Sequence, residues 1–530
     1  MKIYSFSPFG YEGALVTVEV DLRRGIPAVD IVGLADGTVK ESRERMRAAI
    51  RNSGFDFPPE RVLISLSPAD LKKEGAGFDL PIALAVLAAN AEALGAAKFI
   101  AEPILVMGEL ELSGKIRPVK GIHAAVSTAV SSGIRRCIVP VQNADEAREI
   151  NGVQVYGADS LENAFRALQD YYFYEGRGLS DGVETNYLPP GCMNYDGIYF
   201  PEVSSGYEFA EVKGQYKLIR ALQIAAAGGH NLLALGAPGC GKTMAIQKFP
   251  AINPILTLEE AQSVTRIWSL AGLIKPSEPL VRIPPFRIPH QTASIEGICG
   301  GGVNCRPGEI SLAHNGVLFL DEAAEFRSSV LQMLRVPLEN GSITLCRAGR
   351  STNYPAQFQL LMAVNPCPCG NYGSKSKVCL CSSKSIDQYW KKFSAPLLDR
   401  IELRVFVENN SESENPAEER ERLISTDEIR HGVARAVKIQ RRRQGGRNEK
   451  LLPNEVQEFC ELSASAQRVL DNAVLRYGFS PRAVSGCMKV ARTIADIDGS
   501  QTIQKEHVDE AVEYRKLCVN MVPEFDMVGL

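Results

Sequence analysis

Alternation of apolar and polar residues marks several short segments in the first third of the chain. The stretches "ALVTVEVDL" and "RVLISLS" have the two-residue period of half-buried strands. Between them, "TVKESRERMRAAIRNSG" has helical spacing and a terminal glycine, which predicts a helix. The segment "LVMGELELSGKIRPV" predicts a hairpin that turns at Ser113 and Gly114. We therefore expect a mixed α+β domain over residues 1–170.

The pattern changes twice further along the chain. Residues 171–205 are rich in Gly, Pro, Ser and Tyr without a sustained period, which predicts a linker. Residues 206–405 alternate helical stretches with the apolar runs "NLLALG", "GVLFLDE" and "FQLLMAVN", a pattern typical of a parallel α/β sheet. After an acidic, Ser- and Asn-rich stretch, residues 406–530 are predominantly helical. The predicted fold class is an α/β multidomain protein.

The string "GAPGCGKTM" follows the apolar run "NLLAL" and fits the phosphate-binding pattern G-x-x-x-x-G-K-[ST]. In such a loop the glycines let backbone amides surround phosphates, and the following helix directs its positive end at them. Lys242 is expected to reach the β- and γ-phosphates, and the Thr243 hydroxyl to bind Mg²⁺. The predicted nucleotide-binding residues are Gly236, Ala237, Pro238, Gly239, Cys240, Gly241, Lys242, Thr243 and Met244.

A second strand pattern, "GVLFLDEAAEF", ends in two carboxylates, Asp321 and Glu322. Burying a carboxylate costs free energy unless it is paired with a positive charge or a metal ion. Ligands of α/β proteins bind at the carboxyl ends of the sheet strands. Asp321 is suited to hold Mg²⁺ and Glu322 to polarise the attacking water. Together with the glycine-rich loop, they predict an ATP-hydrolysing core with ATP and Mg²⁺ as cofactors.

Composition narrows the class of protein. The chain has 530 residues, enough for several domains, and its formal net charge of -3 confines any basic surface to local patches. The start lacks the pattern of a secretory signal, and the apolar stretch "PIALAVLAANAEALGAAKFI" carries polar residues, which favours a buried helix over a membrane span. Thirteen cysteines without a signal indicate reduced thiols. We expect a cytoplasmic protein with no membrane partner.

Four of the cysteines form the pattern C-x-C-x₉-C-x-C. Four thiolates suit tetrahedral Zn²⁺, although C-x-C is tighter than the usual C-x₂₋₄-C pair. The alternative is four reduced thiols on a loop rich in Gly, Ser and Lys. The candidate zinc ligands are Cys367, Cys369, Cys379 and Cys381.

Longer strings resemble one known family. "RPGEISLAHNGVLFLDEAAEF", "PLENGSITLCRAG", "YPAQFQLLMAVNPCPCG" and "PLLDRIEL" are similar to the YifB/ComM family of magnesium-chelatase-like AAA+ ATPases. The resemblance implies a Lon-protease-like α+β domain at 1–170, an AAA+ P-loop domain with a parallel sheet at 206–405, and a helical lid at 406–530. It also implies ring assembly, with a hexamer expected.

The same resemblance implies further roles in the ATP site. Asn365 matches sensor 1, which orients the attacking water, and Arg400 matches the arginine finger that reaches a neighbouring subunit's γ-phosphate. Arg482 matches sensor 2. Ser480 as the N-cap and Pro481 at the first helical position predict that Arg482 lies in the first turn of a helix. Gln215 ends a segment that borders the base in this family. For each arginine the alternative is a surface ion pair.

The string "MGELELSGKIRPVKGIHAAV" is similar to the Lon protease domain, and "KKEGAGFDLPIALAVLAA" resembles its nucleophile segment, but the catalytic pair is not preserved. Alignment places Gly77 at the serine position and His123 at the lysine position. Neither replacement supplies a nucleophile with a neighbouring base. Ser67 with Lys72 or Lys73 is an alternative pair, although solvated surface is the simpler interpretation. We expect this domain to serve assembly or substrate handling rather than proteolysis.

DNA, branched or single-stranded, is the expected partner, because members of this family resemble hexameric DNA helicases that promote branch migration in recombination and natural transformation. The segment "LENGSITLCRAGR" predicts a hairpin around Asn340 and Gly341, and it ends in Arg347 and Arg350, which we expect to contact DNA. The basic run "ARAVKIQRRRQGGR" is either a second DNA contact or a solvated helix. The alternative function is a magnesium-chelatase-like ATPase that remodels a protein partner.

Overall fold

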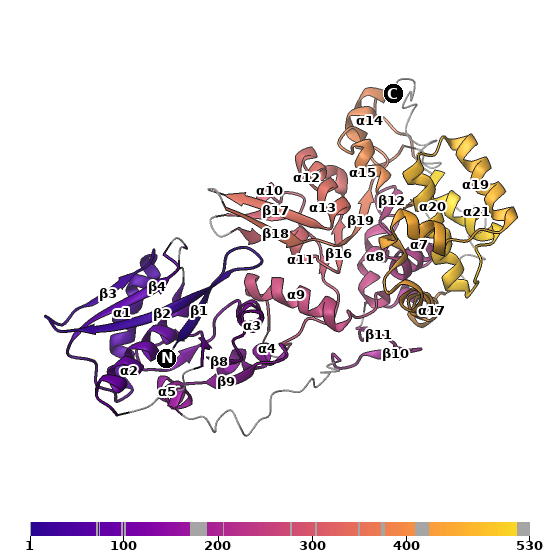
Figure 1. Ribbon diagram of the computed structural model, residues 1–530. Helices are drawn as coiled ribbons and strands as arrows, with labels where there is room; N and C mark the ends of the chain where they lie inside the picture. The colour runs from indigo at the N-terminus through magenta and orange to yellow at the C-terminus, as the bar shows by residue number, and fades with distance from the viewer. Residues whose placement is uncertain are drawn as a thin grey trace.

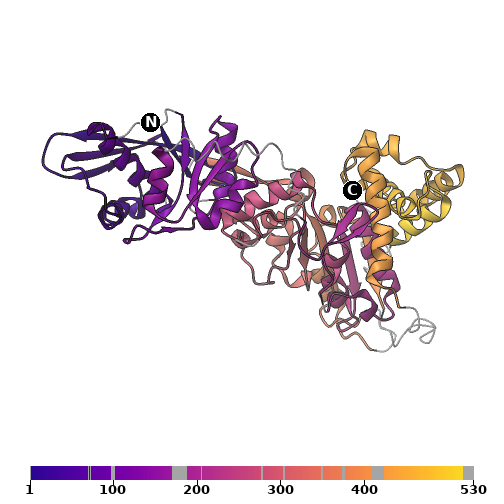
Figure 2. The same ribbon diagram turned by 90° about the horizontal axis from the view of Figure 1, so that it is seen from below.

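Three bodies lie in a row in the computed structural model, with the N-terminal domain at one end, the P-loop domain in the middle and a helical domain at the other end (Figures 1 and 2). The structure describes residues 2–69, 71, 73, 75–96, 99, 102–169, 188–204, 206–275, 278–302, 305–347, 350–372, 377–408 and 423–516.

The N-terminal domain is built on a seven-stranded mixed sheet of order β3-β4-β2-β1-β5-β8-β9. Its strands are β1 (Ile3–Ser7), β2 (Ala14–Arg23), β3 (Val29–Val32), β4 (Arg61–Ser67), β5 (Ile104–Val106), β8 (Arg136–Pro140) and β9 (Gln154–Ala158), with the small hairpin β6 (Glu109–Leu110) and β7 (Ile116–Arg117) beside it. Its helices are α1 (Gly37–Asn52), α2 (Asp79–Ala93), α3 (Ile122–Ser131), α4 (Ala144–Arg148) and α5 (Leu161–Gln169). The two predicted strands, the helix between them and the hairpin at Gly114 are confirmed.

The apolar stretch near residue 80 forms α2, whose residues from Asp79 to Ala88 are all buried. The window Ala76–Ala93 is long and apolar enough to cross a membrane, but most of it is buried inside the structure. This burial is what a core helix of a globular domain requires.

The segment before the P-loop domain is more ordered than a linker. Residues 170–187 lie outside the described part, but β10 (Met193–Tyr195) and β11 (Ile198–Phe200) form an antiparallel hairpin. Arg430 lies over the Phe200 ring and donates to the Pro201 carbonyl at 2.7 Å, so the hairpin packs on the helical domain. The predicted linker at 171–205 is therefore wrong over its second half, because three-residue strands are too short to show a period.

The central domain contains a five-stranded parallel sheet of order β13-β16-β19-β12-β20. The strands are β12 (Leu232–Gly236), β13 (Phe286–Arg287), β16 (Val317–Leu320), β19 (Gln359–Val364) and β20 (Leu403–Val407). The helices are α7 (Tyr216–Gly228), α8 (Lys242–Gln247), α9 (Leu258–Ala271), α10 (Ile295–Cys299), α11 (Glu309–Leu312), α12 (Ser328–Met333), α13 (Arg335–Asn340), α14 (Ser383–Trp390) and α15 (Ala395–Asp399). Strands β12, β16 and β19 are buried throughout, as their continuous apolar runs predict.

The predicted hairpin exists, but its turn lies elsewhere. Asn340 ends α13, and Gly341 caps that helix with a φ of 63°. The hairpin itself is β17 (Ser342–Arg347) with β18 (Arg350–Pro355). The predicted turn at Asn340 and Gly341 is therefore wrong, because a helix C-cap and a two-residue hairpin turn both demand positive φ and share this sequence signal.

The helical domain consists of α17 (Thr426–Gln444), α18 (Pro453–Phe459), α19 (Ala464–Tyr477), α20 (Pro481–Asp498) and α21 (Lys505–Lys516). The basic run lies on α17 and just after it. Arg443 donates to both carboxylate oxygens of buried Asp496, at 2.8 and 2.9 Å, and Arg447 donates to Asn253 Oδ1 at 3.0 Å. These two arginines join elements of the fold, so neither interpretation of the run, a DNA contact or a solvated helix, describes them.

The N-terminal and central domains meet at α3 and α9. Arg266 on α9 donates to the Tyr11 carbonyl at 3.0 Å and to Ser127 Oγ at 3.1 Å, and it lies over the Tyr11 ring. His123 is buried at this junction, where desolvation lowers its pKa to about 3 and keeps the ring neutral.

Candidate functional site: a P-loop nucleotide site

The residues 236–243, here called the phosphate cradle, connect the carboxyl end of β12 to the start of α8. Gly239 and Gly241 have φ values of 80° and 91°, which favour glycine. A Cβ on Gly236 would lie 2.4 Å from the Val407 carbonyl oxygen, so only glycine fits between these strands. The loop therefore has the backbone conformation that a phosphate-binding turn needs.

Lys242 folds back over this loop. Its Nζ donates to the carbonyl oxygens of Gly236 and Ala237, at 2.6 and 2.9 Å, and lies 3.3 Å from Asn365 Oδ1. Burial lowers the pKa of Lys242, opposed in part by Cys240 and the carboxylates Asp321 and Glu322. A bound triphosphate would supply the negative charge that this buried ammonium group lacks.

The two carboxylates lie across from the cradle. Thr243 Oγ1 donates to Asp321 Oδ1 at 2.9 Å, and the backbone amide of Glu322 donates to the same oxygen at 3.0 Å. Glu322 has a left-handed φ of 47°, an unusual conformation for a residue with a side chain, which occurs at functional turns. A hydroxyl beside a carboxylate is the ligand pair that Mg²⁺ uses in P-loop sites.

Asn365 follows β19, the strand between β12 and β16, so its side chain lies beside Lys242. Gln215 approaches from the other side, where its Nε2 donates to the carbonyls of Cys240 and Glu408, at 2.9 and 3.0 Å. Next to it, a cavity of about 560 Å³ is bordered by Tyr216 and Tyr514. The structure thus brings together six predicted residues: Gln215, Lys242, Thr243, Asp321, Glu322 and Asn365.

Arg400 and Arg482 are not part of this cluster. The Arg400 carbonyl accepts from Asn231 Nδ2 at 2.9 Å, and Asn231 directly precedes β12. Since β12 spans five residues, Arg400 lies about 16 Å from the cradle along the strand. The two arginines therefore lie at the amino ends of the parallel strands. The phosphate cradle of the same chain lies at the carboxyl ends of those strands.

A carboxylate that the sequence did not reveal joins the two arginines. Glu339 forms an ion pair with the buried Arg400 side chain, and its other oxygen lies 3.7 Å from Arg482 Nη2. Arg400 holds the pKa of Glu339 below its usual range, with Arg482 adding to the effect. As predicted, Ser480 caps α20 and Arg482 lies in its first turn. We call Glu339, Arg400 and Arg482 the arginine edge.

The candidate DNA-binding pair lies at the tip of the β17–β18 hairpin. Arg347 pairs in register with Arg350, so both residues flank the turn. Their side chains and residues 348–349 lie outside the described part of the structure.

The two residues that align with the Lon catalytic pair lie in different surroundings. Gly77 borders a cavity of about 450 Å³, whereas His123 is buried at the domain junction. Lys73 is fully buried and donates to the Pro68 carbonyl, so the expectation of a solvated lysine is wrong at this position. Lys72 lies outside the described residues.

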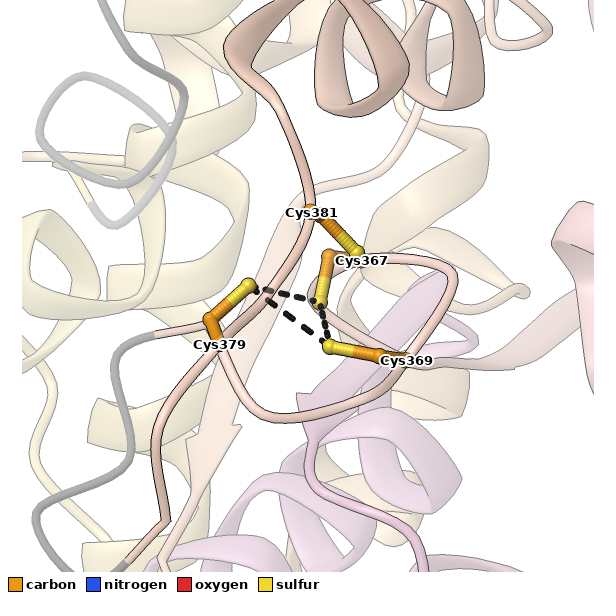
Figure 3. Close-up of side chains that lie close together, drawn as sticks. All are labelled: Cys367, Cys369, Cys379 and Cys381. Atoms are coloured by element: carbon orange, nitrogen blue, oxygen red, sulfur yellow. Dashed lines mark hydrogen bonds between the residues drawn. The ribbon is translucent and has the colours of Figure 1, made fainter.

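The four clustered cysteines lie on the loop that follows Asn365. Their sulfur atoms all lie within 4.8 Å of one another and point toward a common centre (Figure 3). Cys367 is buried, Cys379 and Cys381 are half-buried, and Cys369 is exposed.

Comparison with known proteins agrees with this architecture. A family model described as magnesium chelatase, subunit ChlI, matches residues 208–415. Two related models, subunit ChlI of Mg-chelatase and the ChlI C-terminal region, match residues 18–143 and 424–515. With the parallel sheet and the phosphate cradle, these matches define a magnesium-chelatase-like AAA+ ATPase.

Full-length relatives specify the family. The chain is 38% identical to the uncharacterized protein YifB of Escherichia coli over 521 residues, which cover 97% of each chain. It is 37% identical to the competence protein ComM of Haemophilus influenzae, again over 97% of each chain. A magnesium-chelatase 38 kDa subunit from Acidiphilium rubrum is 28% identical over 30% of this chain. The chain belongs to the YifB/ComM family.

Proposed function

We propose that this protein is an ATP-driven, ring-forming DNA translocase that acts on branched or single-stranded DNA in the cytoplasm. The observation that carries the proposal is the division of the ATP site. The phosphate cradle and the arginine edge lie at opposite ends of the same strands, so one chain does not complete its own site. A ring in which each arginine edge faces the next cradle supplies both halves, and a hexamer is the proposed assembly.

Each residue has a distinct role in this proposal. The cradle amides and Lys242 would hold the triphosphate, and Thr243 and Asp321 would hold a Mg²⁺ ion, which would offset the phosphate charge. Glu322 takes a proton from the attacking water as it approaches the γ-phosphate, and Asn365 orients that water. The neighbour's Arg400 and Arg482 leave Glu339 and stabilise the charge that develops on the transferred phosphoryl group. Gln215 borders the base.

DNA is the proposed substrate for two reasons. A relative that matches over nearly the full length bears the name competence protein. In this chain, the β17–β18 hairpin carries a cationic residue on each side of its turn. Arginines at such a tip would contact the phosphate backbone without reading bases, as a translocating motor requires.

The test is a branch-migration assay on forked DNA, together with ATPase rates with and without that DNA. We expect DNA to raise the ATPase rate, the branch to move, and Glu322→Gln to abolish movement. Replacing Arg347 and Arg350 by alanine should weaken DNA binding. The slope of the logarithm of the binding constant against the logarithm of the salt concentration should become shallower by about two, one for each phosphate that is no longer neutralised. An unchanged ATPase rate with no strand movement would contradict the DNA proposal.

The second candidate is an ATPase that remodels a protein partner, as the matches to chelatase subunit models suggest. Such a motor would hydrolyse ATP at a rate indifferent to DNA. The same assay therefore separates the two candidates, whichever protein the partner is.

A further inference from the structure

The cysteine cluster lies beside the nucleotide site but takes no part in the proposed chemistry. Cys367 Sγ lies 3.3 Å from Cys369 Sγ and 3.7 Å from Cys379 Sγ, and the Cys369 and Cys379 sulfurs are 3.6 Å apart. Cys381 completes the set, from the far end of the loop (Figure 3).

These separations match a tetrahedral metal site. With Zn–S bonds of about 2.3 Å, the edge of a regular tetrahedron of sulfurs is about 3.8 Å. A disulfide would hold two sulfurs about 2.05 Å apart, and all four cysteines are free. The cluster is therefore neither a disulfide pair nor a dispersed set of surface thiols.

A backbone amide is directed at one sulfur of the cluster. The Tyr372 amide donates to Cys367 Sγ at 3.4 Å. Amide donors around sulfur stabilise thiolates and orient them toward a metal.

We propose that Cys367, Cys369, Cys379 and Cys381 bind one Zn²⁺ ion in a closed, structural site. Four thiolate ligands occupy every position of a tetrahedral ion and leave none for a substrate. Soft thiolate ligands select zinc over the hard cations that the phosphate cradle uses. The two metals of this protein are thus separated by ligand chemistry.

The loop that carries this site also contacts the ATP site. Cys367 comes two residues after Asn365, and the Pro366 carbonyl between them accepts from Trp390 Nε1 at 3.1 Å. On the same loop, Gly370 packs so closely on the cradle that a Cβ there would lie 2.3 Å from Pro238 Cδ. A zinc ion that fixes the loop would therefore brace both Asn365 and the phosphate cradle, an inference that rests on the proposed ATPase mechanism.

Metal analysis of the full-length chain, purified under reducing conditions without chelator, tests the site. We expect about one zinc per chain, reduced severalfold in Cys369→Ser and Cys381→Ser. Cys346→Ser is the matched control, because Cys346 is an exposed cysteine on β17 outside the cluster. Absence of zinc from the wild type, or its retention in both cluster variants, would overturn the site.

Cobalt provides a readout that does not depend on variants folding. After replacement of the native metal by Co²⁺, the wild-type protein should show the absorption of tetrahedral cobalt bound to thiolates. A spectrum of octahedral cobalt with oxygen ligands would contradict the proposal.

The bracing role has its own test. Gly370→Ala places a methyl group against Pro238 and should lower the ATPase rate at least tenfold while zinc content stays at one per chain. The control is Gly445→Ala, because Gly445 has a φ of 76°, close to the 78° of Gly370, but an added Cβ there meets nothing within 4 Å. An unchanged ATPase rate in Gly370→Ala would refute the brace and leave the zinc site standing. A wild type that binds zinc but hydrolyses no ATP would refute the proposed function instead.

Discussion

The phosphate cradle and the arginine edge are made of similar ingredients but differ in what holds them. In the cradle, the buried Lys242 ammonium group donates to backbone carbonyls. The nearby carboxylates, Asp321 and Glu322, follow a different strand, β16. At the arginine edge, Arg400 already has a carboxylate partner within its own chain, Glu339. The Lys242 ammonium group thus contacts uncharged carbonyl oxygens, whereas Arg400 is already paired with a carboxylate of its own chain. In the proposed ring, this difference would let a subunit bind ATP alone and still need a neighbour to hydrolyse it.

The largest expected effect comes from the arginine edge. Arg400→Ala should lower the ATPase rate by about 10³-fold or more, because arginine fingers contribute 10³–10⁵ in phosphoryl transfer. ATP affinity of the isolated subunit should change little, because Arg400 lies at the opposite end of the sheet from the cradle. Steady-state ATPase and nucleotide-binding measurements on the same preparation check both. A large loss of ATP affinity in the isolated subunit would mean that Arg400 acts within its own chain.

In the cradle, Glu322→Gln should lower the ATPase rate by about 10²–10⁴-fold, the range for loss of a general base. The amide keeps the shape of the side chain, so ATP and Mg²⁺ should still bind. Glu325→Gln is the matched control, because Glu325 lies nearby in the chain, in the short helical turn after Glu322. Equal rates for the two variants would contradict the assignment of Glu322.

The smallest expected effect concerns the stability of the fold beside the amino end of β12. Glu402 accepts from the Asn231 amide at 3.0 Å, and burial, with the nearby charge of Glu449, raises its pKa to about 7 from 4.5. The folded state thus favours the neutral acid, and this contribution is present below the unfolded pKa and lost as pH rises through about 7. Glu402→Gln should therefore match the wild type near pH 4, below the unfolded pKa, and be more stable near pH 8, by on the order of 3 kcal/mol. Thermal unfolding at both pH values checks this, and a stability difference that does not vary with pH would contradict it.

The contrast between the two regions also separates what sequence can and cannot predict. The cradle is a local feature, a glycine-rich turn between a buried strand and a helix, so spacing alone predicts its residues. The carboxylates and Asn365 follow because each ends a continuous apolar run, and parallel strands end at one edge.

The arginine edge depends on contacts between distant positions. Glu339 and Arg400 are 61 residues apart in sequence, and no periodicity connects them. Glu339 is further obscured because the Asn340-Gly341 pair beside it resembles a hairpin turn, although it ends a helix. The hairpin at 193–200 escapes prediction for a related reason, since its order comes from packing on Arg430 rather than from its own pattern.

The most direct test of the divided site mixes two inactive variants. Lys242→Ala removes the cradle's ammonium group and leaves the arginine edge intact, and Arg400→Ala does the reverse. If each site is shared between neighbours, mixed rings contain interfaces that pair an intact cradle with an intact Arg400. The ATPase rate of the mixture should then rise well above the rate of either variant alone. If both variants assemble and exchange subunits, yet the mixture stays as inactive as its components, the shared site is contradicted.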